Sequence, residues 1–240
     1  MEKKSDNNWQ DMTTKLDSDR LISIFVRTGD DAKVFKIQQA LLESVSDYFV
    51  KALRNEHLGD TTRAGVLRLP EDRVDSWQVL SYWMLRRKLP ANSALKYPLL
   101  AVRCCILGDK YGIEDFQDEA MLALLQCCEK ANVGFGLIKE GVLNSTPGSP
   151  LRRLMIELLV PYVYEDGHHE QTSYQELDVF DGRGYMSEFL EAHDSWTEQE
   201  EDFGCFFDED ERWRTFLVGN WLESHWMFDM NVHLKVGKGE

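Results

Sequence analysis

Two short stretches near the start of the chain are mostly apolar and have the features of strands. Residues 21–26 (LISIFV) are rich in branched and aromatic side chains, and apolar and polar residues alternate within 33–37, at Phe35, Lys36 and Ile37. Residues 28–31 (TGDD), which lie between the two stretches, are typical of turns. The pattern therefore predicts two strands, 21–26 and 33–37, that pair as a hairpin.

The spacing of apolar residues becomes helical directly after the second strand. Two runs have this spacing, and they consist of Leu41, Leu42 and Val45, and of Tyr48, Phe49, Ala52 and Leu53. Ser46 and Asp47 between the runs are suited to the start of a helix. We predict two short helices here, followed by a third strand at 66–69 that stops at Pro70.

Three longer helices are predicted between residues 70 and 130. The first begins at Pro70, where Glu71 and Asp72 are well placed for the N-terminal dipole, and it ends near three basic residues at 86–88. The second runs through Leu100 to Tyr111 and is broken by Gly112, after which the third begins at 113. Strands and helices in this order predict an α+β fold with too few strands for a doubly wound sheet.

The second half of the chain has weaker and stronger helical signals. Glycines at 134, 136 and 141 weaken a helix prediction over 133–142, whereas Ser149 followed by Pro150 is typical of a helix start. The stripe from Leu151 to Tyr162 is the cleanest helical pattern in the chain. Trp213, Leu217 and Trp221 repeat every four residues and predict a last amphipathic helix.

These patterns divide the chain into four predicted regions. They are a flexible N-terminal arm at 1–20, an α+β domain at 21–130, a helical extension at 131–164, and an acidic, aromatic-containing region at 165–240.

The negative charge of the chain is concentrated in one region. The formal net charge is −15, from 42 acidic and 27 basic residues. Between Glu165 and Glu211 there are 17 acids and one base, Arg183, so this stretch carries −16 and the remainder about +1. Such a stretch repels nucleic-acid phosphates, and no basic stripe elsewhere compensates, so we predict no nucleic-acid partner. Apolar residues interrupt the acids, so parts of this region can pack onto the core.

Targeting signals and cysteine use indicate the compartment. The first twenty residues lack the apolar core of a signal peptide, and no stretch is long and apolar enough to span a bilayer. The five cysteines, four of them in the adjacent pairs 104–105 and 127–128, suit a reducing environment. We therefore expect a cytoplasmic or nuclear protein without a membrane partner.

Candidate catalytic and metal-binding residues are scarce. Adjacent cysteines on a helix point about a hundred degrees apart, so each pair supplies one metal ligand easily, and buried thiols are the favoured interpretation. His168 and His169 could hold a metal weakly, but a solvated acidic loop is favoured. The acidic runs 198–202 and 208–211 lack the pattern of a calcium loop. No hydrolase, phosphate-loop or zinc-protease motif occurs, so we predict no cofactor, no metal and no enzymatic activity.

Five pieces of sequence between residues 21 and about 125 together resemble a BTB/POZ domain of the short fungal type. In order they are 35–42 (FKIQQALL), 46–53 (SDYFVKAL), 69–72 (LPED), 79–83 (VLSYW) and 107–113 (LGDKYGI). The stretch 146–153 (TPGSPLRR) also looks like the segment that follows the domain in fungal members. Gln38 and Gln39 stand where the family usually has His-Lys, and 57–60 (HLGD) stands where members often have an acid-rich aromatic segment.

The resemblance implies a protein-interaction module with a small mixed sheet and a cluster of short helices. The leading hypothesis is a non-enzymatic adaptor or scaffold that binds protein partners and self-associates, for example as a homodimer. An alternative within the same class is a substrate-recruiting adaptor that binds a cullin of a ubiquitin ligase. In such members a hydrophobic-x-acid element makes this contact, and Leu58 and Asp60 are a shortened match to it.

Two further hypotheses concern the C-terminal region. The stripe of Trp213, Leu217 and Trp221 either docks a partner or covers the surface of the chain's own core, and the second interpretation is favoured. An alternative of another class is an enzyme that depends on a divalent cation and uses carboxylates between Glu165 and Glu211.

Overall fold

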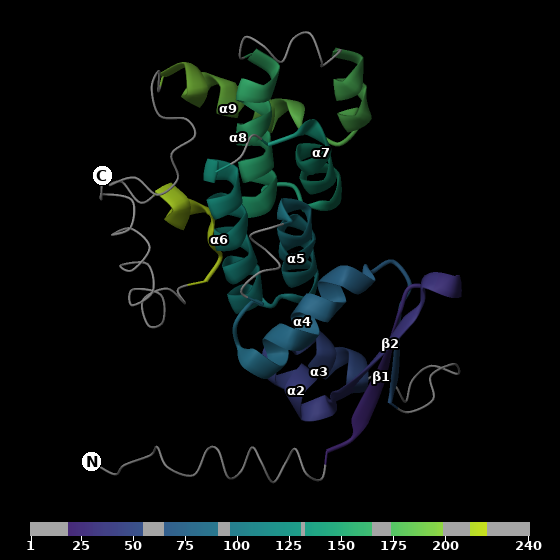
Figure 1. The fold of residues 1–240 in the computed structure, drawn as a ribbon. Helices are drawn as coiled ribbons and strands as arrows, with labels where there is room; N and C mark the ends of the chain where they lie inside the picture. The colour runs from purple at the N-terminus through teal and green to yellow at the C-terminus, as the bar shows by residue number, and fades with distance from the viewer. Residues whose placement is uncertain are drawn as a thin grey trace, which may run out of the picture. The chain divides into compact units, whose positions relative to one another are not determined.

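The elements of the chain group into two compact units, which are described separately below (Figure 1). The computed structural model describes residues 19–54, 65–90, 97–130, 133–164, 174–198 and 212–219. The first unit is Met1–Ala91 with Leu107–Ile113, and the second is Asn92–Ile106 with Glu114–Glu240. The described residues form one three-stranded sheet and eight α-helices, which confirms the predicted α+β class.

The first unit is built on a mixed sheet. Its strands are β1 (Leu21–Val26), β2 (Lys33–Gln38) and β3 (Val66–Leu69), in the order β2-β1-β3. The predicted hairpin of β1 and β2 is confirmed, with Leu21 opposite Gln38. β3 pairs with β1 in parallel. A parallel pair of strands needs a long connection, and the connection from β1 to β3 contains β2 and two helices.

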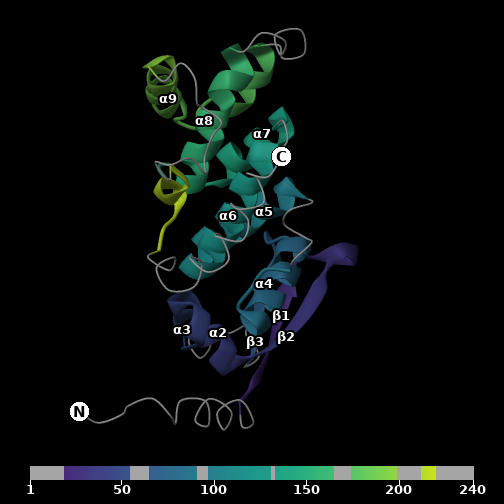
Figure 2. The same ribbon diagram turned by 60° about the vertical axis from the view of Figure 1, so that its left-hand side comes forward.

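Helices cover one face of this sheet. They are α2 (Gln39–Val45), α3 (Asp47–Arg54) and α4 (Val74–Arg86), and both views show them on the same side of the strands (Figures 1 and 2). Ile22, Ile24 and Val26 point to that side and are fully buried. Alternate residues of β1 thus enter the core of the unit, although its sequence is apolar at nearly every position and its branched and aromatic residues were the basis of the prediction.

The boundaries of these helices show one success and one error of the predictions. Ser46 lies between α2 and α3, and its hydroxyl accepts a hydrogen bond from the Tyr48 N–H at 3.1 Å, so the predicted helix start at 46–47 is confirmed. The predicted start of a helix at Pro70 is wrong, because α4 begins at Val74. Asp72 does not cap α4. Its carboxylate instead turns into the core of the unit.

Asp72 is the polar centre of the first unit. Its side chain is 2% exposed and accepts hydrogen bonds from Trp77 Nε1 at 2.6 Å, Tyr111 Oη at 2.5 Å and Lys110 Nζ at 2.6 Å. Burial and the adjacent Asp72 raise the pKa of Tyr111, which therefore remains a hydrogen-bond donor. The Ser46 hydroxyl donates to the Tyr111 carbonyl. This cluster therefore joins residues that are up to 65 positions apart in the sequence.

The second unit is mostly helical. Its helices are α6 (Glu114–Lys130), α7 (Phe135–Asn144), α8 (Pro150–Tyr164), α9 (Met186–Glu198) and the first part of α5 (Pro98–Tyr111). Two 3-10 helices, η3 (Tyr174–Phe180) and η4 (Arg212–Phe216), complete its described elements. α8 packs against α7, α9 and η4. The Ser149 hydroxyl accepts a hydrogen bond from the Arg152 N–H at 3.3 Å, as the predicted helix start requires.

Part of the acidic region folds onto this unit. Phe180 is fully buried, and Tyr185 and Phe189 are each 8% exposed. The helix predicted from the spacing of Trp213, Leu217 and Trp221 is not found in the described residues, because η4 ends at Phe216 and Leu217 and Val218 are not helical. None of the helices in the described ranges combines the length and apolar character that crossing a membrane requires.

Candidate functional site

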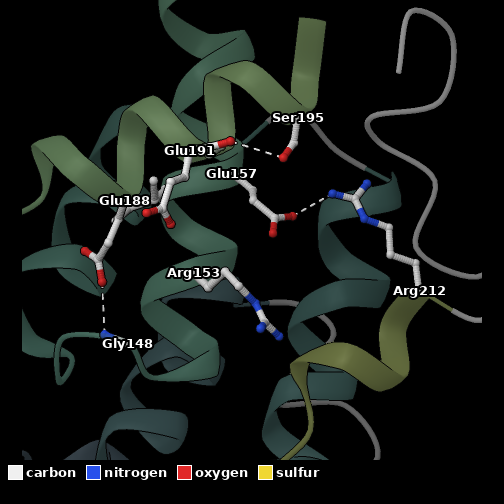
Figure 3. Close-up of a pocket in the computed structure, with 9 residues that line it drawn as sticks. Gly148, Arg153, Glu157, Glu188, Glu191, Ser195 and Arg212 are labelled. Carbon is white, nitrogen blue, oxygen red and sulfur yellow. Dashed lines mark hydrogen bonds and ion pairs between the residues drawn. The ribbon is translucent and has the colours of Figure 1, made fainter. Parts of the chain in front are cut away.

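A cavity of about 390 Å³ lies between α8, α9 and η4 in the second unit (Figure 3). The residues that line it carry mostly charged side chains, and they are Gly148, Arg153, Ile156, Glu157, Glu188, Glu191, Ala192, Ser195 and Arg212. Helical spacing places Arg153, Ile156 and Glu157 on one face of α8. Positions 188, 191, 192 and 195 share one face of α9 for the same reason.

Glu157 and Arg212 form an ion pair at the edge of the cavity. Arg212 donates to the Glu157 carboxylate at 2.6 Å, as the dashed line in Figure 3 marks. Burial raises the pKa of Glu157, while the charges of Arg212 and Arg153 act in the opposite direction. Glu157 is only 17% exposed, so loss of Arg212 would leave a largely buried carboxylate without its closest cation.

Glu188 anchors α9 to the start of α8. It accepts a hydrogen bond from Arg152 Nε at 2.6 Å and another from the Gly148 N–H at 3.0 Å. Arg152 is 2% exposed and also donates to the carbonyls of Val142 and Arg183, at 3.0 and 2.8 Å. The Arg152–Glu188 pair is thus a structural connection among α7, α8 and α9.

The remaining polar groups of the cavity are a hydroxyl and a carboxylate on α9. The Ser195 hydroxyl donates to the Glu191 carbonyl at 3.1 Å. The Glu191 side chain is exposed and has no ion-pair partner in the described part of the chain. A basic group of a partner would therefore find an uncompensated carboxylate here.

The uncovered face of the sheet in the first unit is a second candidate surface. Apolar side chains on this face include Leu21 and Val34, which are 58% and 45% exposed. Phe25 lies directly opposite Val34 and beside Arg68 on β3, whose guanidinium is 4.8 Å from the centre of the phenyl ring. Among the described elements no helix covers this face (Figures 1 and 2).

A second cavity in the first unit, of about 410 Å³, has balanced charges. It lies near the end of β1 and the start of α4, and Arg27 and Arg73 line it. The Arg27 guanidinium is 3.8 Å from the Asp31 carboxylate, and the Arg73 guanidinium is 3.9 Å from that of Asp75. Each cation therefore has a nearby acid, and the cavity has no excess charge to attract an ion.

The structure describes two of the five predicted partner-contact residues. Trp213 is 5% exposed and so is covered by the chain itself, while Leu217 is half-buried. Leu58, Asp60 and Trp221 lie outside the described residues, so the hypothesis of a cullin contact stays a prediction.

The cysteine pairs are placed as small apolar residues. Cys104, Cys105 and Cys127 are buried free thiols, and burial raises the pKa of Cys128 to about 12. In the described ranges no three His, Cys, Asp or Glu side chains gather closely enough to hold a metal ion. His168, His169 and both acidic runs lie outside those ranges, so a cation site there stays a hypothesis.

The charged cavity was not predicted from the sequence. Its ion pairs join residues 36 and 55 positions apart, and no local spacing indicates such pairs. The one available signal was the recurrence of polar residues at 188, 191 and 195 on one helical face.

Comparison with models of protein families finds no match to this chain, and no curated protein matches it.

Proposed function

We propose that this protein is a non-enzymatic protein-interaction module of the BTB/POZ type, which acts as an adaptor or scaffold. One observation carries the proposal. The five sequence pieces that resemble the family all belong to the first unit, including 107–113, which is separated from the rest of that unit by Asn92–Ile106. Pieces that resemble one domain would be expected to fold together.

The contacts among these pieces support the same proposal. Ser46 belongs to the second piece, Asp72 to the third, and Lys110 and Tyr111 to the fifth, and hydrogen bonds connect them. The order of the elements, with a hairpin, two short helices, a strand parallel to β1 and a further helix, agrees with the small mixed sheet and helical cluster that the resemblance implies.

Self-association through the open sheet face is the part of this proposal that is easiest to test. Val34 lies on the edge strand β2, opposite Phe25 of the central strand, and is 45% exposed, so Val34→Asp introduces a charge on that face without emptying the core. We expect the wild-type chain to form a dimer or larger assembly in light scattering at micromolar concentration. The V34D variant should dissociate into monomers, because burying an unpaired carboxylate in an interface is costly.

Gln78→Asp provides the matched control, since Gln78 is exposed on α4 rather than on the open face. This variant should keep the wild-type mass and melting temperature, and circular dichroism should show that V34D is still folded. A strictly monomeric wild-type chain that also captures no specific protein from cells would refute the proposed function. An assembly that V34D leaves intact would refute the assignment of this face.

A further inference from the structure

The segment Arg212–Gly219 lies on the second unit like a bound peptide. Its turn, η4, packs against α8 and α6, and Trp213 and Phe216 are 5% and 1% exposed. The two aromatic side chains are three residues apart, so the single 3-10 turn places both against the same surface. Apolar burial of this kind contributes roughly 1.5–3 kcal/mol for each large side chain.

A buried carboxylate fixes the end of this segment. Asp118 on α6 is fully buried, and its two oxygens accept hydrogen bonds from the consecutive N–H groups of Val218 and Gly219, at 2.8 and 2.9 Å. A Cβ atom added to Gly219 would lie 3.2 Å from Asp118 Oδ2, which is closer than most such contacts. The carboxylate therefore favours a glycine at this position and binds the backbone N–H groups of that glycine and of the residue before it.

The start of the segment is fixed by charge. Arg212 pairs with Glu157 at 2.6 Å. Arg153 donates to the Thr215 carbonyl and lies 5.1 Å from the centre of the Phe216 ring. The docked residues thus offer a base, two aromatic side chains and two backbone N–H groups to a surface made by α6 and α8. Such a set can be offered equally by another polypeptide.

The connection to α9 favours the chain's own segment. Thirteen residues, 199–211, separate the end of α9 from Arg212, and seven of them are acidic. A short connection of this kind gives an effective concentration on the order of 1 mM. If the intrinsic Kd of the internal segment is about 10 µM, only about one surface in a hundred is vacant. A competing peptide would then bind about a hundredfold more weakly than it would to the vacant surface.

We propose that the α6–α8 surface is a peptide-binding site and that Arg212–Gly219 is its internal competitor. The ligand is a segment of a partner protein with a basic residue, an aromatic residue directly after it, a second aromatic residue three positions later and a glycine three positions after that. The identity of the partner rests on the proposed interaction function, whereas the existence of the site rests on the contacts of Asp118, Glu157 and Arg153.

The test uses the full-length chain and a fluorescent peptide with the sequence of residues 212–219. In the double variant Trp213→Ala/Phe216→Ala the internal segment loses both aromatic anchors. We expect this variant to bind the peptide at least tenfold more tightly than the wild-type chain does in fluorescence anisotropy. Adding Asp118→Asn to the double variant should weaken binding of the peptide at least tenfold, and a peptide of scrambled sequence should not bind.

Equal affinity of the wild-type chain and the double variant, or binding that Asp118→Asn leaves unchanged, would overturn the proposal.

Circular dichroism verifies that the double variant is folded. If it is not, Arg212→Glu and Gly219→Val replace it, since each weakens one end of the segment and leaves both aromatic residues in place. Light scattering of the same samples reports self-association separately, so failure of the proposed function and failure of this site give different results.

Discussion

Gly141 is the position at which the packing of the second unit can be tested most sharply. A Cβ atom at this position of α7 would lie 2.3 Å from Met155 Cγ and 2.8 Å from Met155 Sδ. Met155 is fully buried on α8, so it has no open space into which it could move. We therefore expect Gly141→Ala to force α7 and α8 apart or to push Met155 out of its preferred rotamer.

The size of the effect follows from two opposing contributions. Overpacking of a close contact costs about 1–3 kcal/mol. Replacing glycine by alanine within a helix contributes about 1 kcal/mol in the opposite direction. The net result should be a loss of up to about 2 kcal/mol in the free energy of unfolding, measured by urea denaturation with circular dichroism. Gly136 on the same helix is the matched control, because an added Cβ there meets nothing within 4 Å.

The two alanine variants should therefore differ in sign. Gly136→Ala is expected to be neutral or to stabilise the chain by about 0.5 kcal/mol, since only the backbone contribution remains. In the double variant Gly141→Ala/Met155→Ala the new methyl group fills part of the space that Met155 leaves. Its loss should be smaller than the sum of the two single losses by at least about 1 kcal/mol. Equal effects of G141A and G136A would refute the close packing of α7 on α8.

Two further predictions concern buried polar groups. Asp72→Ala leaves the ring donors of Trp77 and Tyr111 without their acceptor and should destabilise the chain by about 3–6 kcal/mol, whereas Asp72→Asn keeps one carbonyl oxygen and should cost about 1–3 kcal/mol. Equal losses in urea denaturation would contradict this role of the carboxylate. Burial raises the pKa of Cys128 to about 12, so iodoacetamide near neutral pH should label this thiol much faster after denaturation than in the native chain, as mass spectrometry would show. Equal labelling rates would contradict its burial.

Local patterns were sufficient for the strands and for most helices. Branched and aromatic residues indicated β1, alternation at 35–37 indicated β2, and the turn-type residues at 28–31 indicated the connection between them. The glycines of α7 made the sequence evidence for this helix weak, because helix propensity counts only the local cost of glycine. In the folded chain Gly141 is the residue that lets α8 approach α7, and this benefit has no local signal.

The predictions of helix boundaries were wrong where a side chain or a backbone group forms hydrogen bonds with residues that are distant in the sequence. The helix start predicted at Pro70 assumed that Asp72 acts on the helix dipole, whereas its carboxylate accepts hydrogen bonds from rings elsewhere in the unit. The helix predicted from Trp213 would have committed the N–H groups of Val218 and Gly219 to carbonyls four residues earlier. These groups donate instead to Asp118, which lies a hundred positions away.

Asp72 and Asp118 are both buried, but replacing each of them should have a different effect on the stability of the chain. The partners of Asp72 include the buried rings of Trp77 on α4 and Tyr111 at the end of α5, which belong to the core of the first unit. The partners of Asp118 are two backbone groups of a segment that other contacts also hold. Asp118→Asn should therefore open this segment while leaving most of the second unit folded.

Hydrogen exchange distinguishes these two kinds of loss. In Asp118→Asn the amides of Val218 and Gly219 should exchange at least tenfold faster than in the wild-type chain, while the amides of α8 keep their protection. Asp72→Asn should accelerate exchange across β1 and α4 and leave Val218 and Gly219 unaffected. If Asp118→Asn instead accelerated exchange throughout α6 and α8, the segment would be part of the cooperative core. It could then not exchange with a partner peptide without unfolding the unit.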